Sequence, residues 1–186
     1  FAVNVCPGDQ GWVDRVSAVR VTPGWAARGY IWIGDARVSC LFDTGAYRNV
    51  MSKEFADALW ANERTRPAGR IRDEVRDAPT CEGITGNATN PITHQSQFQI
   101  TFKGFDVNKS FNTQPGLSAV RDVNFAEISG VNEVVLIGAP TLAMLGFGLN
   151  TDGMTMSKLG LAIPFVAEDA RNDRRLVVQS FGSVKG

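Results

Sequence analysis

The feature that most constrains the fold is a pair of apolar runs that ends on an acidic residue. The runs lie within residues 29–42, are rich in β-branched and aromatic side chains, and flank a turn at Gly34-Asp35-Ala36. Short apolar runs joined through a glycine-containing turn predict a β-hairpin. The second run continues into Asp43-Thr44-Gly45-Ala46, so the hairpin carries a carboxylate to the point where a buried strand ends.

This tetrapeptide has the residues expected of a loop that presents one carboxylate at the floor of a cleft. Gly45 permits the close approach of another backbone or an unusual backbone angle. The hydroxyl of Thr44 can hold the loop through a hydrogen bond. Asp-Thr-Gly by itself also suits an ordinary junction of strand and turn, so its meaning depends on the surrounding segments.

Composition favours one β-rich domain. The chain has 186 residues, and its 19 glycines and 8 prolines accompany many valines, isoleucines and threonines. Nineteen basic residues balance 19 acidic ones, so no global charge attracts nucleic acid or an anionic membrane. The longest apolar stretch, residues 134–149, is interrupted by glycines and a proline, and we predict no membrane span.

The cysteines and the histidine narrow the catalytic classes. Cys6, Cys40 and Cys81 are widely spaced and odd in number, which favours a reducing compartment over a disulfide-stapled scaffold. His94 is the single histidine, so it would have to be the base of any serine or cysteine centre, and the usual multi-histidine zinc sites are excluded. We expect no metal and no cofactor. We interpret His94 as a surface or turn residue and Cys40 as a small buried hydrophobic residue.

Two short helices are expected. Ser52 is a suitable N-cap for a helix over residues 53–60, and Pro140 stands at the opening of a second helix that reaches Leu145. The highly charged residues 62–78 are interpreted as a solvated loop or an exposed helix.

Further strands are expected after a glycine-bearing loop at residues 81–93. Residues 94–113 alternate in polarity and predict a second hairpin with its turn at Lys103 and Gly104, followed by a longer connection over residues 114–132. The later apolar runs that predict strands are residues 133–138, 153–157, 160–165 and 176–178.

The segment GYIWIGDARVSCLFDTGAYRNVMS, residues 29–52, resembles the first half of the retropepsins, the aspartic proteases of retroviruses and LTR retrotransposons. In that family a hairpin feeds an apolar strand, then Asp-Thr/Ser-Gly-Ala, then a further apolar stretch, which here is Val50-Met51. The resemblance covers roughly residues 28–165.

Two further family elements can be placed by the same resemblance. A run of apolar residues that ends in glycine before a short helix is matched by Leu136, Ile137 and Gly138, although the family often has Arg, Asn or Asp after that glycine and this chain has Ala139-Pro140. Between the two motifs lies the place of the flap, the hairpin that closes over substrate. The flap candidates are Gly83, Ile84, Thr85 and Gly86.

A single Asp-Thr/Ser-Gly motif occurs in the chain, so the resemblance implies a two-fold homodimer. Asp43 and the partner's Asp43 would share one proton, because two like charges a few Å apart do not both ionise easily. One carboxylate would take a proton from water while the other donates to the scissile carbonyl. The family also implies cross-dimer hydrogen bonds from Thr44, contact between Gly45 and the bound peptide, and a place in the inner pockets for Ala46.

We therefore expect an all-β, retropepsin-like barrel with one or two short helices, and an aspartic endopeptidase that hydrolyses extended polypeptides. In a retroelement its role would be polyprotein processing. The expected partners are a second copy of the chain and a polypeptide substrate, without nucleic acid or membrane. The alternatives are an inactive retropepsin-fold module for dimerisation or peptide binding, and a monomeric β-barrel with an accidental Asp-Thr-Gly.

Three parts of the chain are distinguished. Residues 1–27 are an N-terminal extension that can supply strands to the dimer interface, residues 28–165 are the protease-like domain, and residues 166–186 are a charged connector with a C-terminal strand or tail. The first residues lack the pattern of a signal peptide and an initiator methionine, which indicates a fragment or a processed product. The expected location is the cytoplasm or a virus-like particle.

Overall fold

The structure is a computed structural model of the chain, and it describes residues 26–76, 80–81, 90–108, 116–131, 134–150, 153–166 and 177–178. Strands dominate this part of the chain, with two α-helices and two 3₁₀ turns, at Arg66–Ala68 and Ser157–Leu159. The strands and helices are, in chain order, β1 (Ala26–Ile33), β2 (Ala36–Asp43), β3 (Val50–Ser52), α1 (Lys53–Ala61), β4 (Gly69–Glu74), β5 (Thr80–Cys81), β6 (Asn90–Asp106), β7 (Leu117–Ile128), β8 (Val135–Gly138), α2 (Ala139–Leu145), β9 (Phe147–Leu149), β10 (Gly153–Met156), β11 (Leu161–Pro164) and β12 (Val177–Val178).

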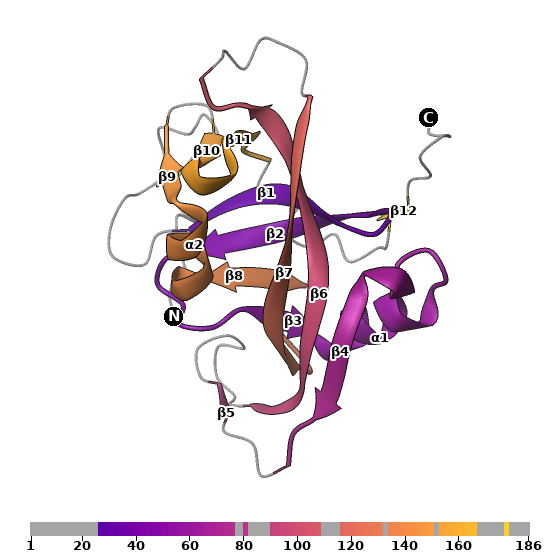
Figure 1. The fold of residues 1–186 in the computed structure, drawn as a ribbon. Helices are drawn as coiled ribbons and strands as arrows, with labels where there is room; N and C mark the ends of the chain where they lie inside the picture. Colours follow the sequence, from indigo (N-terminus) through magenta and orange to yellow (C-terminus); the bar gives the residue numbers. More distant parts are fainter. Residues whose placement is uncertain are drawn as a thin grey trace.

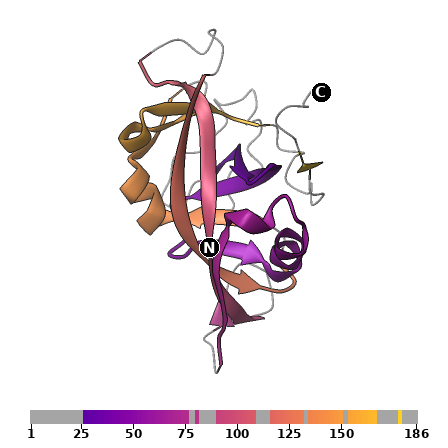
Figure 2. The same ribbon diagram turned by 45° about the vertical axis from the view of Figure 1, so that its right-hand side comes forward.

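Six of these strands close into a mixed barrel. They are hydrogen-bonded in the order β1-β2-β8-β3-β7-β6. The barrel closes because β1 also pairs with β6, at Trp32 and Thr101. The pairs β2–β8 and β3–β7 are parallel, and the other pairs of the barrel are antiparallel. In Figures 1 and 2 the long β6–β7 pair stands upright, and β1, β2 and β8 run across it. The expected fold class, mostly β with two short helices, is confirmed for the single chain.

The first hairpin forms as its sequence predicts. Ile33 pairs with Ala36 across a two-residue turn, and Gly34 adopts a left-handed backbone angle, φ 61°. A Cβ at Gly34 would lie 2.7 Å from the carbonyl oxygen of Arg64, so the turn also needs glycine for space. The β2 strand then runs to Asp43 with six of its eight residues buried.

The apolar side chains gather into two clusters. The larger one fills the barrel and extends under both helices, and it includes Phe42, Cys40, Phe98 and Phe102 at 0% exposure, which confirms the expectation for Cys40. The second adjoins the loop that follows β2, and its buried members are Ala46, Val50, Ile92, Ala126, Ile128, Val131 and Leu136.

The predicted turn at Lys103 and Gly104 is wrong. Strand β6 continues through both residues to Asp106, and Gly104 pairs with Leu117 of β7. A Cβ on Gly104 would lie 2.2 Å from the carbonyl oxygen of Ala162 in β11. The glycine therefore marks the close approach of another strand, which a sequence pattern does not distinguish from a turn.

Two predicted loops also contain strands. Residues 69–74, inside the charged stretch, form β4, which pairs with β6, and residues 117–128, expected as a connection, form β7. Most side chains of β4 and of the first half of β7 are exposed. Because neither face of these segments is apolar, the alternation that predicts a strand is missing.

Both predicted helices are present. The Phe55 backbone N–H donates to Ser52 Oγ at 3.3 Å and begins α1, and Pro140 lies in the first turn of α2. None of the helices described is long and apolar enough to cross a membrane. The first 25 residues, with the strands expected there, lie outside the described residues, whereas β12 pairs with β2 of the same chain.

Candidate active site

Asp43 ends β2 between two neighbouring strands. It pairs with Ala26 of β1 on one side and with Gly138 of the parallel strand β8 on the other. Its side chain is 0% exposed in the single chain, whereas Thr44 and Gly45 are partly exposed. The carboxylate thus lies at the base of a loop that reaches the surface.

The Asp43 loop is held by its own backbone. The Gly45 N–H donates to Asp43 Oδ1 at 2.7 Å, and the Ala46 N–H donates to the Asp43 carbonyl oxygen at 3.2 Å. The first bond fixes the direction of the carboxylate. Ala46 is buried in the second apolar cluster, beside Val50 and Leu136.

The second predicted motif meets this loop. Leu136 and Ile137 are buried in β8, and the N–H of Ala139 donates to the carbonyl oxygen of Ala46 at 2.7 Å. A Cβ on Gly138 would lie 2.6 Å from the Arg48 carbonyl oxygen and 2.7 Å from that of Ala46. Glycine is required at position 138 because the two segments pass so close together.

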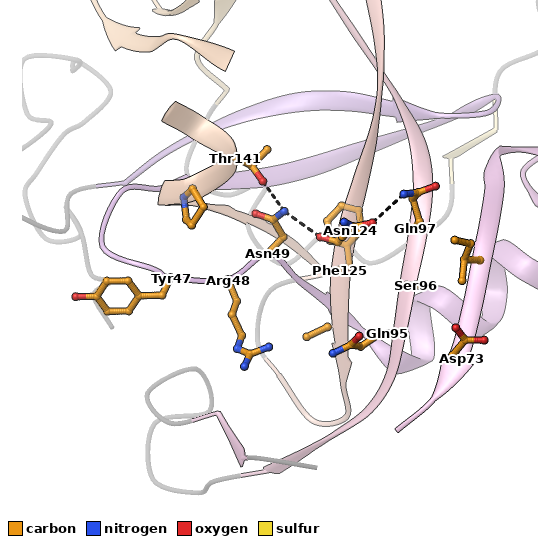
Figure 3. Close-up of a pocket in the computed structure, with 13 residues that line it drawn as sticks. Tyr47, Arg48, Asn49, Asp73, Gln95, Ser96, Gln97, Asn124, Phe125 and Thr141 are labelled. Atoms are coloured by element: carbon orange, nitrogen blue, oxygen red, sulfur yellow. Dashed lines mark hydrogen bonds between the residues drawn. The ribbon is translucent and has the colours of Figure 1, made fainter. Parts of the chain in front are cut away.

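Asn49 is a site residue that no sequence motif singles out. Its Oδ1 accepts from the Gly138 N–H at 2.8 Å, and its Nδ2 donates to Thr141 Oγ1 at 2.7 Å and to the Asn124 carbonyl oxygen at 2.9 Å. One side chain thus joins the Asp43 loop to β8, α2 and β7. It supplies the polar contact at the start of α2 that Ala139-Pro140 cannot make, and Figure 3 shows it between Thr141 and Asn124.

The flap candidates Gly83, Ile84, Thr85 and Gly86 lie outside the described residues. The described chain around them is antiparallel: β4 pairs with β6 from Gly69 opposite Phe98 to Glu74 opposite His94. Their assignment to a flap therefore stays a prediction from the sequence resemblance.

A cavity of about 450 Å³ opens beside the Asp43 loop, and we call it the side pocket. The loop side contributes Tyr47 and Arg48, and strand β4 contributes Asp73 on another wall (Figure 3). The full lining is Tyr47, Arg48, Asn49, Ile71, Asp73, Gln95, Ser96, Gln97, Asn124, Phe125, Ala126, Pro140 and Thr141.

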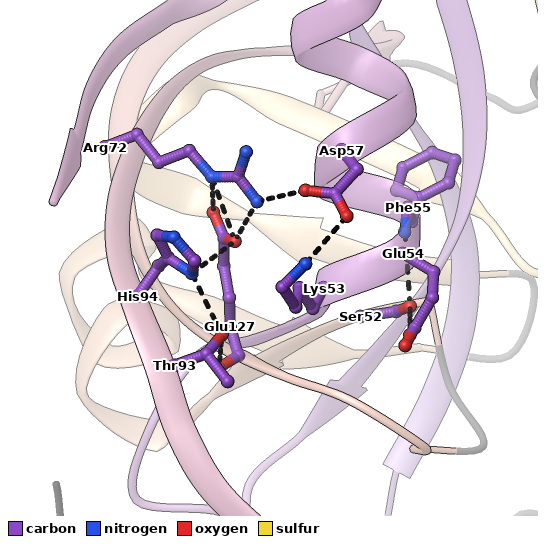
Figure 4. A network of polar contacts seen from close by, with 9 residues as sticks. All are labelled: Ser52, Lys53, Glu54, Phe55, Asp57, Arg72, Thr93, His94 and Glu127. Carbon is purple, nitrogen blue, oxygen red and sulfur yellow. Dashed lines mark hydrogen bonds and ion pairs between the residues drawn. The ribbon is translucent and has the colours of Figure 1, made fainter. Parts of the chain in front are cut away.

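A charged cluster lies under β4 (Figure 4). Glu127 of β7 is 0% exposed, and Arg72 reaches it with Nε at 3.1 Å from both carboxylate oxygens and Nη2 at 2.7 Å from Oε1. The same Nη2 lies 2.6 Å from Asp57 Oδ1, and Asp57 Oδ2 lies 2.9 Å from Lys53 Nζ. Partial burial lowers the pKa of Arg72, but its hydrogen bonds to Glu127 and Asp57 outweigh this and raise it.

His94 belongs to this cluster. Its Nδ1 lies 3.6 Å from Glu127 Oε1 and 3.0 Å from Thr93 Oγ1, and its side chain is 19% exposed. The interpretation of His94 as a surface or turn residue is therefore wrong, because it lies in β6 against a buried carboxylate. Within the described ranges, no three His, Cys, Asp or Glu side chains come together as metal ligands.

Comparisons with known proteins give a structural likeness. No protein-family model matches the chain, and no curated protein matches it. Among solved structures, the chain is similar to the retroviral protease-like domain of Ddi1 from Leishmania major, with a TM-score of 0.49 and 15% sequence identity over 81% of this chain and 97% of that one. The barrel, the Asp-Thr-Gly loop at the end of β2, and an apolar strand that ends in glycine before a short helix agree with the sequence resemblance: the fold of this chain is retropepsin-like.

Proposed function

We propose that the chain is an aspartic endopeptidase that works as a homodimer, with Asp43 and the partner's Asp43 as the catalytic pair. The observation that carries the proposal is the placement of Asp43. It ends a core strand, its Oδ1 is fixed by the Gly45 N–H at 2.7 Å, and its loop is tied to β8. A carboxylate held this firmly has the preorganisation that acid–base catalysis needs.

The proposed reaction needs two carboxylates that share one proton. The ionised carboxylate removes a proton from water, and the water oxygen bonds to the scissile carbonyl carbon while the protonated carboxylate donates to the carbonyl oxygen. The carboxylate that took the proton from water then gives it to the amide nitrogen, the C–N bond of the tetrahedral intermediate breaks, and the other carboxylate removes a proton from a hydroxyl of that intermediate. The products are a free carboxyl end and a free amine end. Following the sequence resemblance, we expect the substrates to be extended polypeptides with apolar side chains near the cut.

The experiment compares the wild-type protein with Asp43→Asn on a diverse peptide pool at pH about 4 to 7. We expect cleavage by the wild type, block by a statine-type transition-state inhibitor, and a loss of about 10³-fold or more in the variant, which corresponds to about 4 kcal/mol. Asp122→Asn is the matched control, because Asp122 is an exposed carboxylate of β7 away from the loop. Equal cleavage by the wild type and Asp43→Asn would contradict the proposal.

A non-catalytic peptide-binding module is the second candidate. The bond between Gly45 N–H and Asp43 Oδ1 is compatible with it as well, since a buried aspartate with only a structural role makes the same turn contact. A dimeric wild-type protein that binds peptides but cleaves none at any tested pH would select this function. Processing of a polyprotein, and a location in the cytoplasm or a virus-like particle, remain predictions from the sequence.

A further inference from the structure

Another cavity, of about 490 Å³, opens at the side of the barrel, and we call it the outer pocket. It lies where strand β6 changes partners, since β6 pairs with β1 at Thr101 and with β11 at Phe105 and Asp106 (Figure 1). The chain that follows β11 borders the cavity, and there the Val166 N–H donates to the Arg28 carbonyl oxygen of β1 at 3.0 Å. The pocket is therefore enclosed by parts of three strands.

The lining is aromatic and comes from the face of the strands that points away from the core. In β1 the core residues are Ile31 and Ile33, both 0% exposed. Because side chains of a strand alternate between its two faces, Tyr30 and Trp32 leave β1 on the other side. The same alternation in β6 places Phe105 on that side. The three rings line one cavity, and their flat faces suit stacking on a planar apolar group.

The charges at the outer pocket are positive. Lys103 lines it, with its Nζ 4.6 Å from the centroid of the Trp32 ring. Beside the pocket, Arg37 of β2 lies over the Tyr30 ring, with its Cζ 4.3 Å from the ring centroid. Among the described residues that line the cavity, none is acidic. The pocket is therefore complementary to an anion and disfavours a cation.

Size and polarity together narrow the class of ligand. The volume lies within the range of about 300–1,000 Å³ that is usual for small-molecule sites, which are mostly apolar with a few polar groups. A neutral planar ligand would displace water from the Lys103 ammonium and give it no partner, which costs free energy. A carboxylate on the same ligand offsets that cost with a charge-assisted hydrogen bond.

The outer pocket is separate from the Asp43 loop. Ala26 of β1 pairs with Asp43, whereas Tyr30 and Trp32 lie four and six positions farther along the strand, which is about 13 and 20 Å at the rise of an extended chain. No residue of the Asp43–Ala46 loop lines the pocket. A ligand in the outer pocket therefore does not take the place of a peptide at Asp43.

We propose that the outer pocket binds a small planar aromatic anion, with the ring system among Tyr30, Trp32 and Phe105 and the carboxylate at Lys103. The inference goes beyond the proposed function and does not depend on it, because the site lies outside the proposed catalytic one. It gives the chain a ligand site for an aromatic carboxylate whether or not the chain cleaves peptides.

The test is a calorimetric titration of the full chain with naphthalene probes that differ only in charge: naphthoate, naphthylmethanol and naphthylmethylammonium, all substituted at the same ring position. We expect naphthoate to bind about tenfold more tightly than the neutral alcohol, and the ammonium probe to bind more weakly than both. Octanoate, an anion without a ring, should bind about tenfold more weakly than naphthoate. Absence of naphthoate binding, or an affinity for the ammonium probe or octanoate that equals it, would overturn the inference.

The variant Lys103→Met tests where the anion binds. Methionine keeps an apolar stem of similar length, so naphthoate and the neutral alcohol should then bind equally well. Lys158→Met is the matched control, because Lys158 is an exposed lysine outside the pocket, and it should bind naphthoate as the wild type does.

A competition experiment separates this site from the proposed catalytic one. Asp43→Asn, and the wild type in the presence of the statine-type inhibitor, should bind naphthoate with unchanged affinity. A preference for naphthoate that survives in Lys103→Met, or displacement of naphthoate by the inhibitor, would show that the anion binds elsewhere and would refute the proposal.

Discussion

Glycine at position 138 allows strand β8 to pass close to the Asp43 loop, because a side-chain carbon at this position would not fit. The carbonyl oxygens of Arg48 and Ala46 occupy the space that a Cβ on Gly138 would need. The same crossing places the Gly138 N–H against Asn49 Oδ1. The geometry of the Asp43 loop therefore depends on one residue without a side chain and on one amide.

Replacing Gly138 by alanine should destabilise the fold. The added Cβ must move two backbone carbonyls from 2.6 and 2.7 Å, and overpacking of this kind costs about 1–3 kcal/mol. Urea unfolding measures the change in the free energy of unfolding. Gly148→Ala serves as the comparison, because its Cβ meets only the rotatable Thr155 hydroxyl at 3.0 Å, and an equal loss in both variants would argue against the crossing as the cause.

Strand β4 has little apolar attachment to the barrel. Four of its six residues are exposed, and the side chain that reaches inward is that of Arg72. Its bidentate contact with the fully buried Glu127 joins β4 to β7, and its bond to Asp57 joins β4 to α1. The cluster therefore fixes β4 against the barrel.

Arg72→Met should cost about 3–5 kcal/mol of unfolding free energy, because it leaves the buried Glu127 carboxylate without its guanidinium. The double variant Arg72→Met with Glu127→Leu should recover a large part of that loss, since no buried charge then remains unpaired. Denaturant unfolding of both variants measures the difference. Lys53→Met, at the exposed end of the cluster, should change stability by less than about 0.5 kcal/mol, and a double variant no more stable than Arg72→Met would contradict the explanation.

The same cluster predicts a pH dependence through Asp57. Burial raises the pKa of this carboxyl, but hydrogen bonds from Lys53 and Arg72 outweigh it and hold the pKa below its usual 3.8. A lowered folded-state pKa means that the unfolded chain binds the proton more readily. The stabilisation is therefore complete above that ordinary pKa and is lost as pH falls through the lower, folded-state value.

Asp57→Asn should accordingly differ in stability from the wild type by a constant amount above about pH 5 and by progressively less below about pH 4. Urea midpoints measured from pH 3 to pH 7 give the two curves. Asp122→Asn provides the reference, because Asp122 is exposed and its ion pair with Arg70 Nε is long, at 3.7 Å. A difference between wild type and Asp57→Asn that stays flat to pH 3 would refute the role of the cluster.

At the scale of the whole molecule, one chain supplies one carboxylate to the proposed reaction. The barrel closes within the single chain, whereas the proposed catalytic pair needs two chains. Activity should therefore rise with the square of protein concentration where the monomer prevails, and linearly once dimers saturate. Sedimentation at the same concentrations measures the dimer fraction, and activity that stays linear in a purely monomeric sample would exclude a shared Asp43 pair.

Strong local patterns made much of this molecule predictable. The alternating apolar runs before Asp43, the Ser52 cap and the proline that opens α2 each act over a few residues, and the structure has all three. Strands without an apolar face were not predictable, because their stability comes from partners distant in the chain. Strand β7 shows this, as its exposed first half is held by β6.

The sequence by itself determined the hairpin, the two helices, and the choice of Asp43, Leu136, Ile137 and Gly138 as site residues. Only the tertiary structure revealed that Gly104 lies inside a strand, that Asn49 ties the loop to β8 and α2, and that Arg72 and Glu127 meet under β4. The physical reason is separation along the chain. Hairpins and caps are decided by neighbours, whereas a close backbone crossing or a buried ion pair joins residues tens of positions apart, and no local pattern records it.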